Sequence, residues 1–274
     1  MDTGTGQINR VTAGTPVTGE LFDTHTHLYD EQFDADLDQV FSRMAGARVT
    51  RVLCVGFDVN SSEQALAMAQ SRPGVVAAVG VHPHDAADVA PDYLDRLAGL
   101  ARHPRVVALG EMGLDYYRDL SPRPVQRQIF REQLALVREL VMPVIIHVRD
   151  AFGDMMDILR ADGISPAGGV MHCFSGSWEW ARQAMEMGFY ISLAGPVTFK
   201  KAPKLKEIAV KVPQDRLLIE TDCPYLAPEP YRGRRNEPAY VKYIAEHIAR
   251  LRDMPPGELA RVTTANAKKL FNME

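Results

Sequence analysis

The chain has 274 residues, of which 46% are hydrophobic and 24% charged, and its formal net charge at pH 7 is −4. These proportions are those of an ordinary globular protein, so they exclude the disordered and fibrous classes. The negative net charge argues against a protein that coats nucleic acid by electrostatic attraction alone, although it allows an enzyme that contacts a few phosphates.

The N-terminal part of the sequence predicts a leader and no membrane anchor. Residues 1–19 are rich in Gly, Thr and Pro without periodicity, which indicates a flexible segment. No apolar run approaches the ~20 residues of a transmembrane helix, and no basic start precedes an apolar targeting segment. The cysteines, Cys54, Cys173 and Cys223, form no C-x-x-C pair. We therefore expect a cytoplasmic protein with no membrane partner and no obligate protein partner.

From residue 20 onward, short apolar runs alternate with amphipathic segments. The first run is LFDTH, and seven strand-length runs follow in the order RVLCVGF, GVVAAVG, RVVALGE, PVIIHV, GGVMHCF, FYISLAG and RLLIETD. After the second run, Asn60 followed by Glu63 predicts the N-terminal cap of a helix. The helical pattern after the fourth run places one apolar stripe on Phe130, Leu134, Val137 and Val141.

Eight such units favour the α/β class and a single (β/α)8 TIM-type barrel over residues 20–274, because no change of composition marks a second domain. The segments 239–251 and 256–271 then predict terminal helices. A doubly wound open sheet is the alternative, but no glycine-rich fingerprint follows the first run.

Polar residues stand at the carboxyl ends of these runs, where barrel enzymes place their active sites. His25 and His27 lie two apart, so on an extended strand they point to the same side. Any one histidine alone could be a core residue with a hydrogen-bond partner. The strand ends together, however, predict one rim of four imidazoles and two carboxylates, namely His25, His27, Glu111, His147, His172 and Asp222.

This ligand set predicts a centre for divalent metal ions. Neutral nitrogens combined with carboxylate oxygens suit Mg²⁺, Mn²⁺ or Zn²⁺. Six ligands exceed what one tetrahedral zinc needs, so we expect two ions, with Glu111 as the bridging carboxylate. We assign catalytic roles to Glu111 and to Asp222, which could bind a metal and also take a proton from the attacking water.

Three residues next to the predicted ligands have structural interpretations. Cys173 and Cys223 directly follow two predicted ligands, and strand alternation turns them away as small buried hydrophobes. Glu220 lies two residues before Asp222, where it would orient the ligands from deeper in the barrel.

Several residues are candidate substrate contacts by position. His82 and His84 end the third run and could donate hydrogen bonds to a phosphate, although a turn stiffened by Pro83 is an equal alternative for His84. Each of the others also has an ordinary surface interpretation; they are Tyr116, Arg118, Ser175 and Arg235.

Several long motifs lie in order between about Leu21 and Phe271, and they are FDTHTHL, GVHPH, GEMGLDYY, QRQIFREQLALVREL, PVIIHVRDA, HCFSGS, ISLAGPVTF, IETDCPYLAP and RRNEPAYV. In these motifs the chain resembles the TatD family of metal-dependent hydrolases, which is similar to the wider amidohydrolase superfamily. The resemblance implies a single barrel, deoxyribonuclease or related phosphodiesterase activity, and a divalent-metal centre on His25, His27, Glu111, His147, His172 and Asp222.

We therefore expect a divalent-metal-dependent deoxyribonuclease that hydrolyses phosphodiesters with a metal-activated water. Its DNA substrate would be ends or single strands, degraded exonucleolytically, because no basic stripe offers a path for a duplex. The same metal rim polarises a carbonyl, so hydrolysis of a small ester, lactone or amide is an alternative. A catalytically inactive, metal-stabilised binding protein is the non-enzymatic alternative, and carboxylates able to activate water argue against it.

Overall fold

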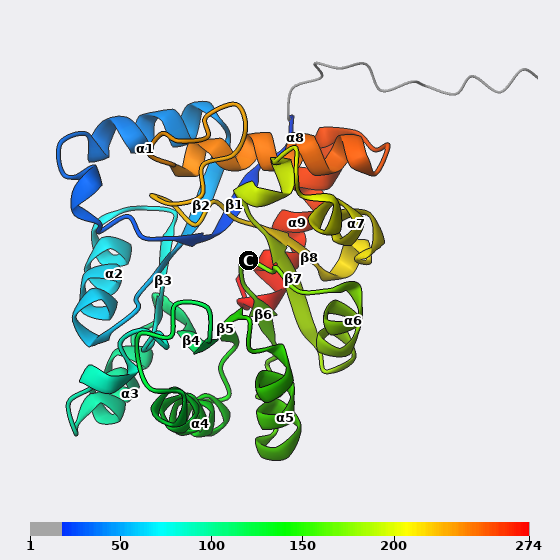
Figure 1. The fold of residues 1–274 in the computed structure, drawn as a ribbon. Helices are drawn as coiled ribbons and strands as arrows, with labels where there is room; N and C mark the ends of the chain where they lie inside the picture. The colour runs from blue at the N-terminus through cyan, green and yellow to red at the C-terminus, as the bar shows by residue number, and fades with distance from the viewer. Residues whose placement is uncertain (1–17, 274) are drawn as a thin grey trace, which may run out of the picture.

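The computed structural model describes residues 18–273, so the predicted leader lies outside the described residues except for its last two. Strands at the centre of the molecule are surrounded by helices (Figure 1). The strands are β1 Leu21–Thr26, β2 Val49–Val55, β3 Val75–Val79, β4 Val106–Asp115, β5 Val144–Arg149, β6 Gly169–Met171, β7 Phe189–Leu193 and β8 Leu217–Ile219. They form one sheet in sequence order, and each neighbouring pair is parallel.

A parallel bridge between Thr26 and Cys223 brings the segment after β8 back to β1, so the sheet is nearly closed. Among the described residues, the helices are α1 Leu37–Gly46, α2 Val59–Ser71, α3 Tyr93–Ala101, α4 Arg123–Leu140, α5 Phe152–Asp162, α6 Trp178–Glu186, α7 Pro203–Lys211, α8 Val241–Leu251 and α9 Pro256–Leu270. The predicted (β/α)8 barrel with terminal helices is thereby confirmed, and the open-sheet alternative is wrong. Within residues 18–273, no helix combines the length and apolar character needed to span a membrane.

Alternation along the strands divides the apolar side chains into two layers. One layer packs towards the helices, and the other fills the barrel with residues such as Phe22, Leu53 and Ile145. The C-terminal end of α9 joins this inner layer through Phe271, whose ring centroid lies 6.0 Å from that of Phe22. Because apolar side chains fill the interior of the barrel, the polar side chains lie at the carboxyl ends of the strands.

Two local predictions are wrong. The helix α2 begins at Val59 and is capped by Asp58, whose carboxylate accepts from the backbone N–H of Ser61 at 2.6 Å, so Asn60 is not the cap. The helix α4 ends before Val141, which adopts a left-handed conformation and is 57% exposed, so it lies off the buried stripe. A left-handed C-terminal residue stops the helix, and the hydrophobic period alone does not reveal that stop.

Replacing Gly113 by alanine is expected to lower the free energy of unfolding by about 2 kcal/mol or more. Gly113 pairs with His147 in the β4–β5 ladder at φ 150°, and an added Cβ would lie 1.9 Å from the His147 carbonyl oxygen. Urea unfolding measures the change. Gly99→Ala is the matched control, because Gly99 lies inside α3 with nothing within 4 Å of an added Cβ, so stability should rise slightly. Equal effects at both sites would contradict the steric argument.

Candidate metal centre

The structure brings the six predicted ligand side chains together at the carboxyl ends of the strands. His25 lies in β1 and His27 directly follows it, and their ring centroids are 5.0 Å apart. The pairing of β1 with β2 is irregular between Asp23 and Thr26, which is where the strand delivers His25 to the site. Four more strands supply the rest, namely Glu111 from β4, His147 from β5, and His172 and Asp222 from the loops after β6 and β8.

Glu111 lies at the middle of the imidazoles. Its Oε1 is 2.7 Å from Nδ1 of His147 and 3.1 Å from Nε2 of His172, and its Oε2 is 3.2 Å from Nε2 of His25. Burial raises the pKa of this carboxyl, but the imidazoles of His172, His82 and His25 outweigh that effect, so the pKa lies well below its ordinary value. Glu111 is therefore an anionic carboxylate whose two oxygens face different histidines.

Asp222 lies beside the first histidine pair. Its Oδ1 is 3.6 Å from Nε2 of His27 and 3.9 Å from Nε2 of His25. Burial raises the pKa of Asp222, but the interaction with His27 and the charges of nearby imidazoles bring it below its ordinary value. The backbone N–H of Asp222 donates to the His25 carbonyl at 2.9 Å, which ties the loop after β8 to β1. The carboxylate remains 14% exposed and faces the open cavity described below.

Buried oxygen atoms contact the Nδ1 atoms of two imidazoles. The Nδ1–H of His27 donates to the Val55 carbonyl oxygen at 2.8 Å, which turns Nε2 towards Asp222. His172 Nδ1 lies 2.8 Å from Oε1 of Glu220. Glu220 also accepts from the Cys173 backbone N–H at 2.7 Å and from the Ser192 hydroxyl at 2.6 Å. Glu220 thus lies where an orienting carboxylate is expected.

Asp115 is part of the site, although the sequence analysis did not single it out. Its Oδ2 is 3.2 Å from Nε2 of His147 and 3.0 Å from Nε2 of His84, so two carboxylates hold the His147 ring from both sides. Burial raises the pKa of Asp115, but its hydrogen bonds with His147 and His84 bring it well below its ordinary value. The signal that could have found it is its spacing, four residues after Glu111 on one extended strand, which places both on the same face.

The two cysteines that follow ligands differ in burial. Cys223 is fully buried, in agreement with its interpretation as a small hydrophobe, whereas Cys173 is only partly buried. Cys173 has a positive φ of 41°, so the chain has already left the strand there, and strand alternation does not describe its direction.

The residues present fit divalent cations. Three groups hold ligand atoms that all lie within 4.8 Å of one another, and they are His25, His27 and Asp222; His25, His172 and Glu220; and His82, Glu111 and His147. Within residues 18–273, both ring nitrogens of His25 are buried and form no hydrogen bond, although Nε2 lies 3.2 Å from Oε2 of Glu111. Buried ring nitrogens without a hydrogen bond are unfavourable, and a cation at this position would bind one of them. Nitrogen and carboxylate donors match zinc, manganese and magnesium.

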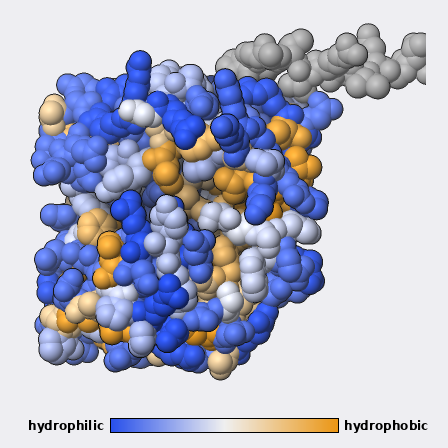
Figure 2. Space-filling view, viewed as in Figure 1, coloured by the Kyte–Doolittle hydropathy of each residue, from blue (hydrophilic) through white to orange (hydrophobic). Residues whose placement is uncertain are grey.

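An open cavity of about 640 Å³ lies over this centre. Among the predicted substrate contacts, His82, His84 and Arg118 line it. Newly identified lining residues are Phe57, Asp85, Asp115, Leu120, Arg149, Tyr225 and Leu226. Seen from the direction of Figure 1, the periphery of the molecule is mainly hydrophilic and apolar residues gather around the middle (Figure 2).

The other predicted substrate contacts do not line this cavity. The Tyr116 hydroxyl donates to Asp154 at 2.6 Å. Ser175 lines a separate small cavity beside Leu193 and Leu205. Arg235 is ion-paired with Asp36, at 2.7 Å between its Nη1 and Oδ1. His82, besides lining the cavity, lies with its Nε2 3.5 Å from Glu111 Oε1, so it belongs to a candidate ligand group as well.

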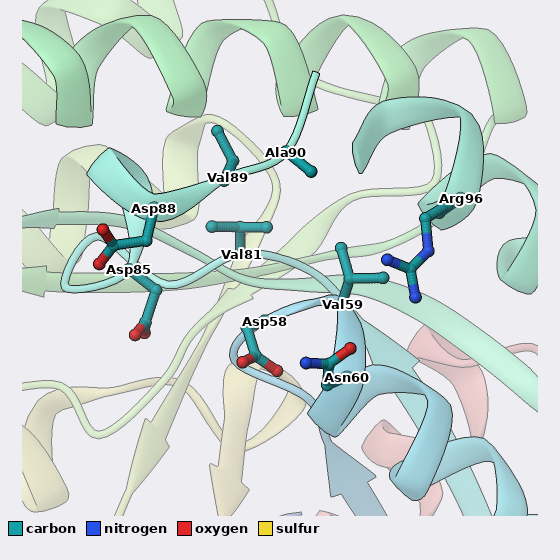
Figure 3. Close-up of a pocket in the computed structure, with 9 residues that line it drawn as sticks. All are labelled: Asp58, Val59, Asn60, Val81, Asp85, Asp88, Val89, Ala90 and Arg96. Carbon is teal, nitrogen blue, oxygen red and sulfur yellow. The ribbon is translucent and has the colours of Figure 1, made fainter. Parts of the chain in front are cut away.

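A further cavity, of about 170 Å³, lies between the start of α2 and the loop after β3 (Figure 3). Asp58, Asp85 and Asp88 line it together with Arg96, and Asp85 also lines the larger cavity. Burial and the charge of Asp58 raise the pKa of Asp85 to about 6. The larger cavity lies over the candidate ligand groups and is lined by Arg118 and Arg149 as well as by carboxylates, so it is the better place for a substrate of the metal centre.

Replacing Arg235 by alanine is expected to lower the free energy of unfolding by about 1 kcal/mol and to leave KM within twofold of the wild type. Its ion pair with Asp36 is partly exposed, and Arg43 also pairs with Asp36 at 2.9 Å. Thermal unfolding and steady-state kinetics measure the two quantities, and Asp36→Asn should reproduce the loss of stability. A large rise in KM with unchanged stability would restore Arg235 as a substrate contact.

Known proteins resemble this chain over most of its length. A family model described as TatD related DNase matches residues 22–272. The chain is 51% identical to the "Uncharacterized metal-dependent hydrolase YabD" of Bacillus subtilis, which covers 92% of this chain and 99% of that protein. It is 38% identical to the "3'-5' ssDNA/RNA exonuclease TatD" of Salmonella typhimurium, and the match covers 92% of this chain and 99% of that protein. The crystal structure of YJJV, a TatD homolog from Escherichia coli K12, gives a TM-score of 0.88 at 30% identity. The match covers 93% of this chain and 98% of that chain.

Proposed function

Because the chain belongs to the TatD related DNase family, a family of metal-dependent hydrolases, we propose that it is a divalent-metal-dependent deoxyribonuclease that removes nucleotides from the ends of single strands. The observation that carries the proposal is Glu111, a buried carboxylate in contact with the rings of His25, His147 and His172 at the floor of an open cavity. The Salmonella typhimurium relative is named as an exonuclease for single-stranded DNA and RNA, which supports this substrate class.

The proposal assigns two divalent ions to His25, His27, Glu111, His147, His172 and Asp222. Support for two comes from Glu111, because its Oε2 faces His25 while its Oε1 faces His147, so one carboxylate can serve both groups. Bound ions would supply Lewis-acid polarisation of a phosphoryl oxygen and activation of a water molecule. His82 is a further candidate ligand because it shares a group with Glu111 and His147.

The chain's own residues would handle the proton and the substrate. Asp222 is the catalytic carboxylate that accepts a proton from the attacking water, since it is anionic and faces the cavity. His84 donates a hydrogen bond to a phosphoryl oxygen, and Asp115 holds His84 and His147 in place at 3.0 and 3.2 Å. The three free cysteines favour a cytoplasmic setting.

The test uses metal-stripped protein with end-labelled single-stranded DNA, duplex DNA and single-stranded RNA. Mg²⁺, Mn²⁺ and Zn²⁺ are added separately, and product lengths are followed on a gel. We expect a ladder of one-nucleotide steps from single strands, only after metal is added, and no ladder from Asp222→Asn. Parallel reactions with a nitrophenyl ester and a lactone cover the alternative substrates. Turnover of these acyl compounds without cleavage of nucleic acid would overturn the proposal.

The salt dependence of substrate binding is expected to be shallow. Among the described residues that line the cavity, the Lys and Arg side chains are Arg118 and Arg149. Two phosphate contacts to a single strand give a slope of about −1.4 in a plot of log K against log salt concentration. Fluorescence anisotropy with a labelled oligonucleotide measures the slope. A slope of about −4 or steeper would reveal a basic surface outside this cavity.

A further inference from the structure

The mouth of the cavity has two chemically different walls. Arg118 follows β4 and Arg149 ends β5, whereas Tyr225 and Leu226 follow β8, and all four line the cavity. In an eight-stranded barrel whose strands run in sequence order, β8 lies across the barrel from β4. The cationic wall and the apolar wall therefore face each other over the metal centre.

We propose that the two walls divide a single-stranded substrate between them: Arg118 and Arg149 bind backbone phosphates, and Tyr225 with Leu226 stacks the terminal base. This inference rests on the proposed nuclease function and adds the direction in which the strand crosses the mouth. A single strand can splay its base away from its phosphates, whereas a paired base within a duplex cannot leave its stack without unpairing.

The arginine wall is available to an anion. Arg118 and Arg149 are exposed, and within the described part of the chain neither forms an ion pair with a carboxylate. On the neighbouring helix α4, by contrast, Arg123 and Arg127 both form ion pairs with aspartates, at 3.1 and 3.0 Å. The Arg149 guanidinium lies 3.7 Å from the centroid of the Tyr117 ring, which holds its plane in place.

The loop that carries Arg118 is also held in place. Asp115 Oδ1 accepts from the backbone N–H groups of Tyr117 at 2.9 Å and of Arg118 at 2.8 Å. The other oxygen of the same carboxylate contacts His147. The phosphate-binding wall and the metal centre therefore share one rigid support.

Both side chains of the apolar wall are exposed, Tyr225 at 50% and Leu226 at 40%. Among the described residues, four other large hydrophobic side chains are exposed, and two of them, Tyr117 at 60% and Leu120 at 64%, follow β4 beside the arginines. Their concentration at the mouth indicates a binding surface. Aromatic rings exposed beside a phosphate site are the platforms on which single-stranded bases stack.

The loop after β8 is ordered before any substrate arrives. Buried Asn236 donates through Nδ2 to the carbonyl oxygens of Thr221 at 2.8 Å and Tyr225 at 2.6 Å. The Tyr225 hydroxyl donates to Asp30 at 3.2 Å. Leu226 has a φ of 54°, a left-handed conformation that this framework maintains. The platform is therefore fixed in position relative to Asp222.

The experiment measures binding of fluorescein-labelled oligothymidine to the metal-free protein by anisotropy, over a range of salt concentrations. Arg118→Ala and Arg149→Ala should each weaken binding by about 3- to 10-fold at low salt and reduce the salt slope by about 0.7. Tyr225→Ala should weaken binding by a similar factor without changing the slope, while Tyr225→Phe should bind as the wild type does. Arg131→Ala is the matched control, since Arg131 pairs with Asp162 away from the mouth.

A second probe carries an abasic site in place of its terminal nucleoside. The wild type should bind it about 3- to 10-fold more weakly than the intact strand, and Tyr225→Ala should bind both strands equally. Circular dichroism establishes that each variant is folded. Unchanged affinity in both arginine variants, or equal wild-type affinity for the abasic and intact strands, would overturn the assignment of the walls.

Failure of this inference is distinguishable from failure of the proposed function. Metal-loaded wild-type protein is assayed on bis(p-nitrophenyl) phosphate, a phosphodiester without a base, and on the intact strand. If it cleaves the strand while the wall variants bind normally, only the wall assignment fails. If it cleaves neither substrate, the nuclease proposal and the inference that rests on it both fail.

Discussion

Replacing Glu111 by alanine should abolish metal-dependent turnover while the barrel still folds. Glu111 contacts three of the other predicted ligands through its two oxygens. Its removal leaves cations held mainly by neutral imidazoles, so the affinity for metal and the activation of water are lost together. The barrel itself depends on its apolar layers, to which a carboxylate at the rim contributes little.

Three measurements on one preparation test this prediction: bound metal by mass spectrometry, cleavage of single-stranded DNA, and thermal unfolding with and without a chelator. Metal at 100 times its Kd would stabilise the wild type by about 2.7 kcal/mol, so the chelator should lower the Tm of the wild type and leave that of Glu111→Ala unchanged. Glu111→Gln keeps the shape of the side chain and separates loss of charge from loss of volume. Near-normal cleavage with two metals still bound would show that the bridging assignment is wrong.

Replacing Glu220 by alanine should have the second largest effect, and it should affect both stability and metal binding. The carboxylate is 1% exposed and accepts from the Cys173 backbone N–H and the Ser192 hydroxyl. Leaving these donors buried and unpaired should lower the free energy of unfolding by about 2–4 kcal/mol. Its contact with His172 orients a predicted ligand, and losing such a contact weakens metal affinity by about 10- to 100-fold.

Urea unfolding of the metal-free protein and metal titration by calorimetry separate the two effects. Glu220→Gln is the control, because the amide oxygen still accepts hydrogen bonds and most of the stability should return. Ser192→Ala removes only one donor, so it should lose less stability than Glu220→Ala and retain metal affinity. Full metal affinity in Glu220→Ala would mean that His172 needs no support from this carboxylate.

The sequence predicts the strands and the rim because both follow from local rules. Apolar runs of strand length identify each strand, and parallel strands in a barrel bring their carboxyl ends to one rim. Histidines as distant as His25 and His172 therefore meet, with ring centroids 3.7 Å apart, without any signal that links them in the sequence. The fold and the family are confirmed, while the metal and substrate roles of individual residues stay predictions.

Interactions between distant segments could not be predicted from local patterns. Arg235 is attractive as a phosphate contact because it lies in a basic run, but Asp36, far away in sequence, pairs with it. Asp115 was overlooked because the predicted fourth strand stops at Glu111, whereas β4 continues to Asp115. For Arg235 the partner is brought in by the tertiary fold, and periodicity carries no information about it, whereas Asp115 would have followed from a longer fourth strand.

The seam where the barrel closes has a consequence for biosynthesis. Backbone hydrogen bonds from Asp222 to His25 and from His27 to Cys223, at 2.9 and 2.8 Å, join the first strand to the segment after the last one. Those contacts join residues 25–27 with residues 222–223, so they form only when the ribosome has released most of the chain. A nascent chain that has exposed its first histidines still lacks Asp222 and the closing seam. An emerging chain without Asp222 therefore has an incomplete set of candidate ligands, and the set is completed only when the closing seam can form.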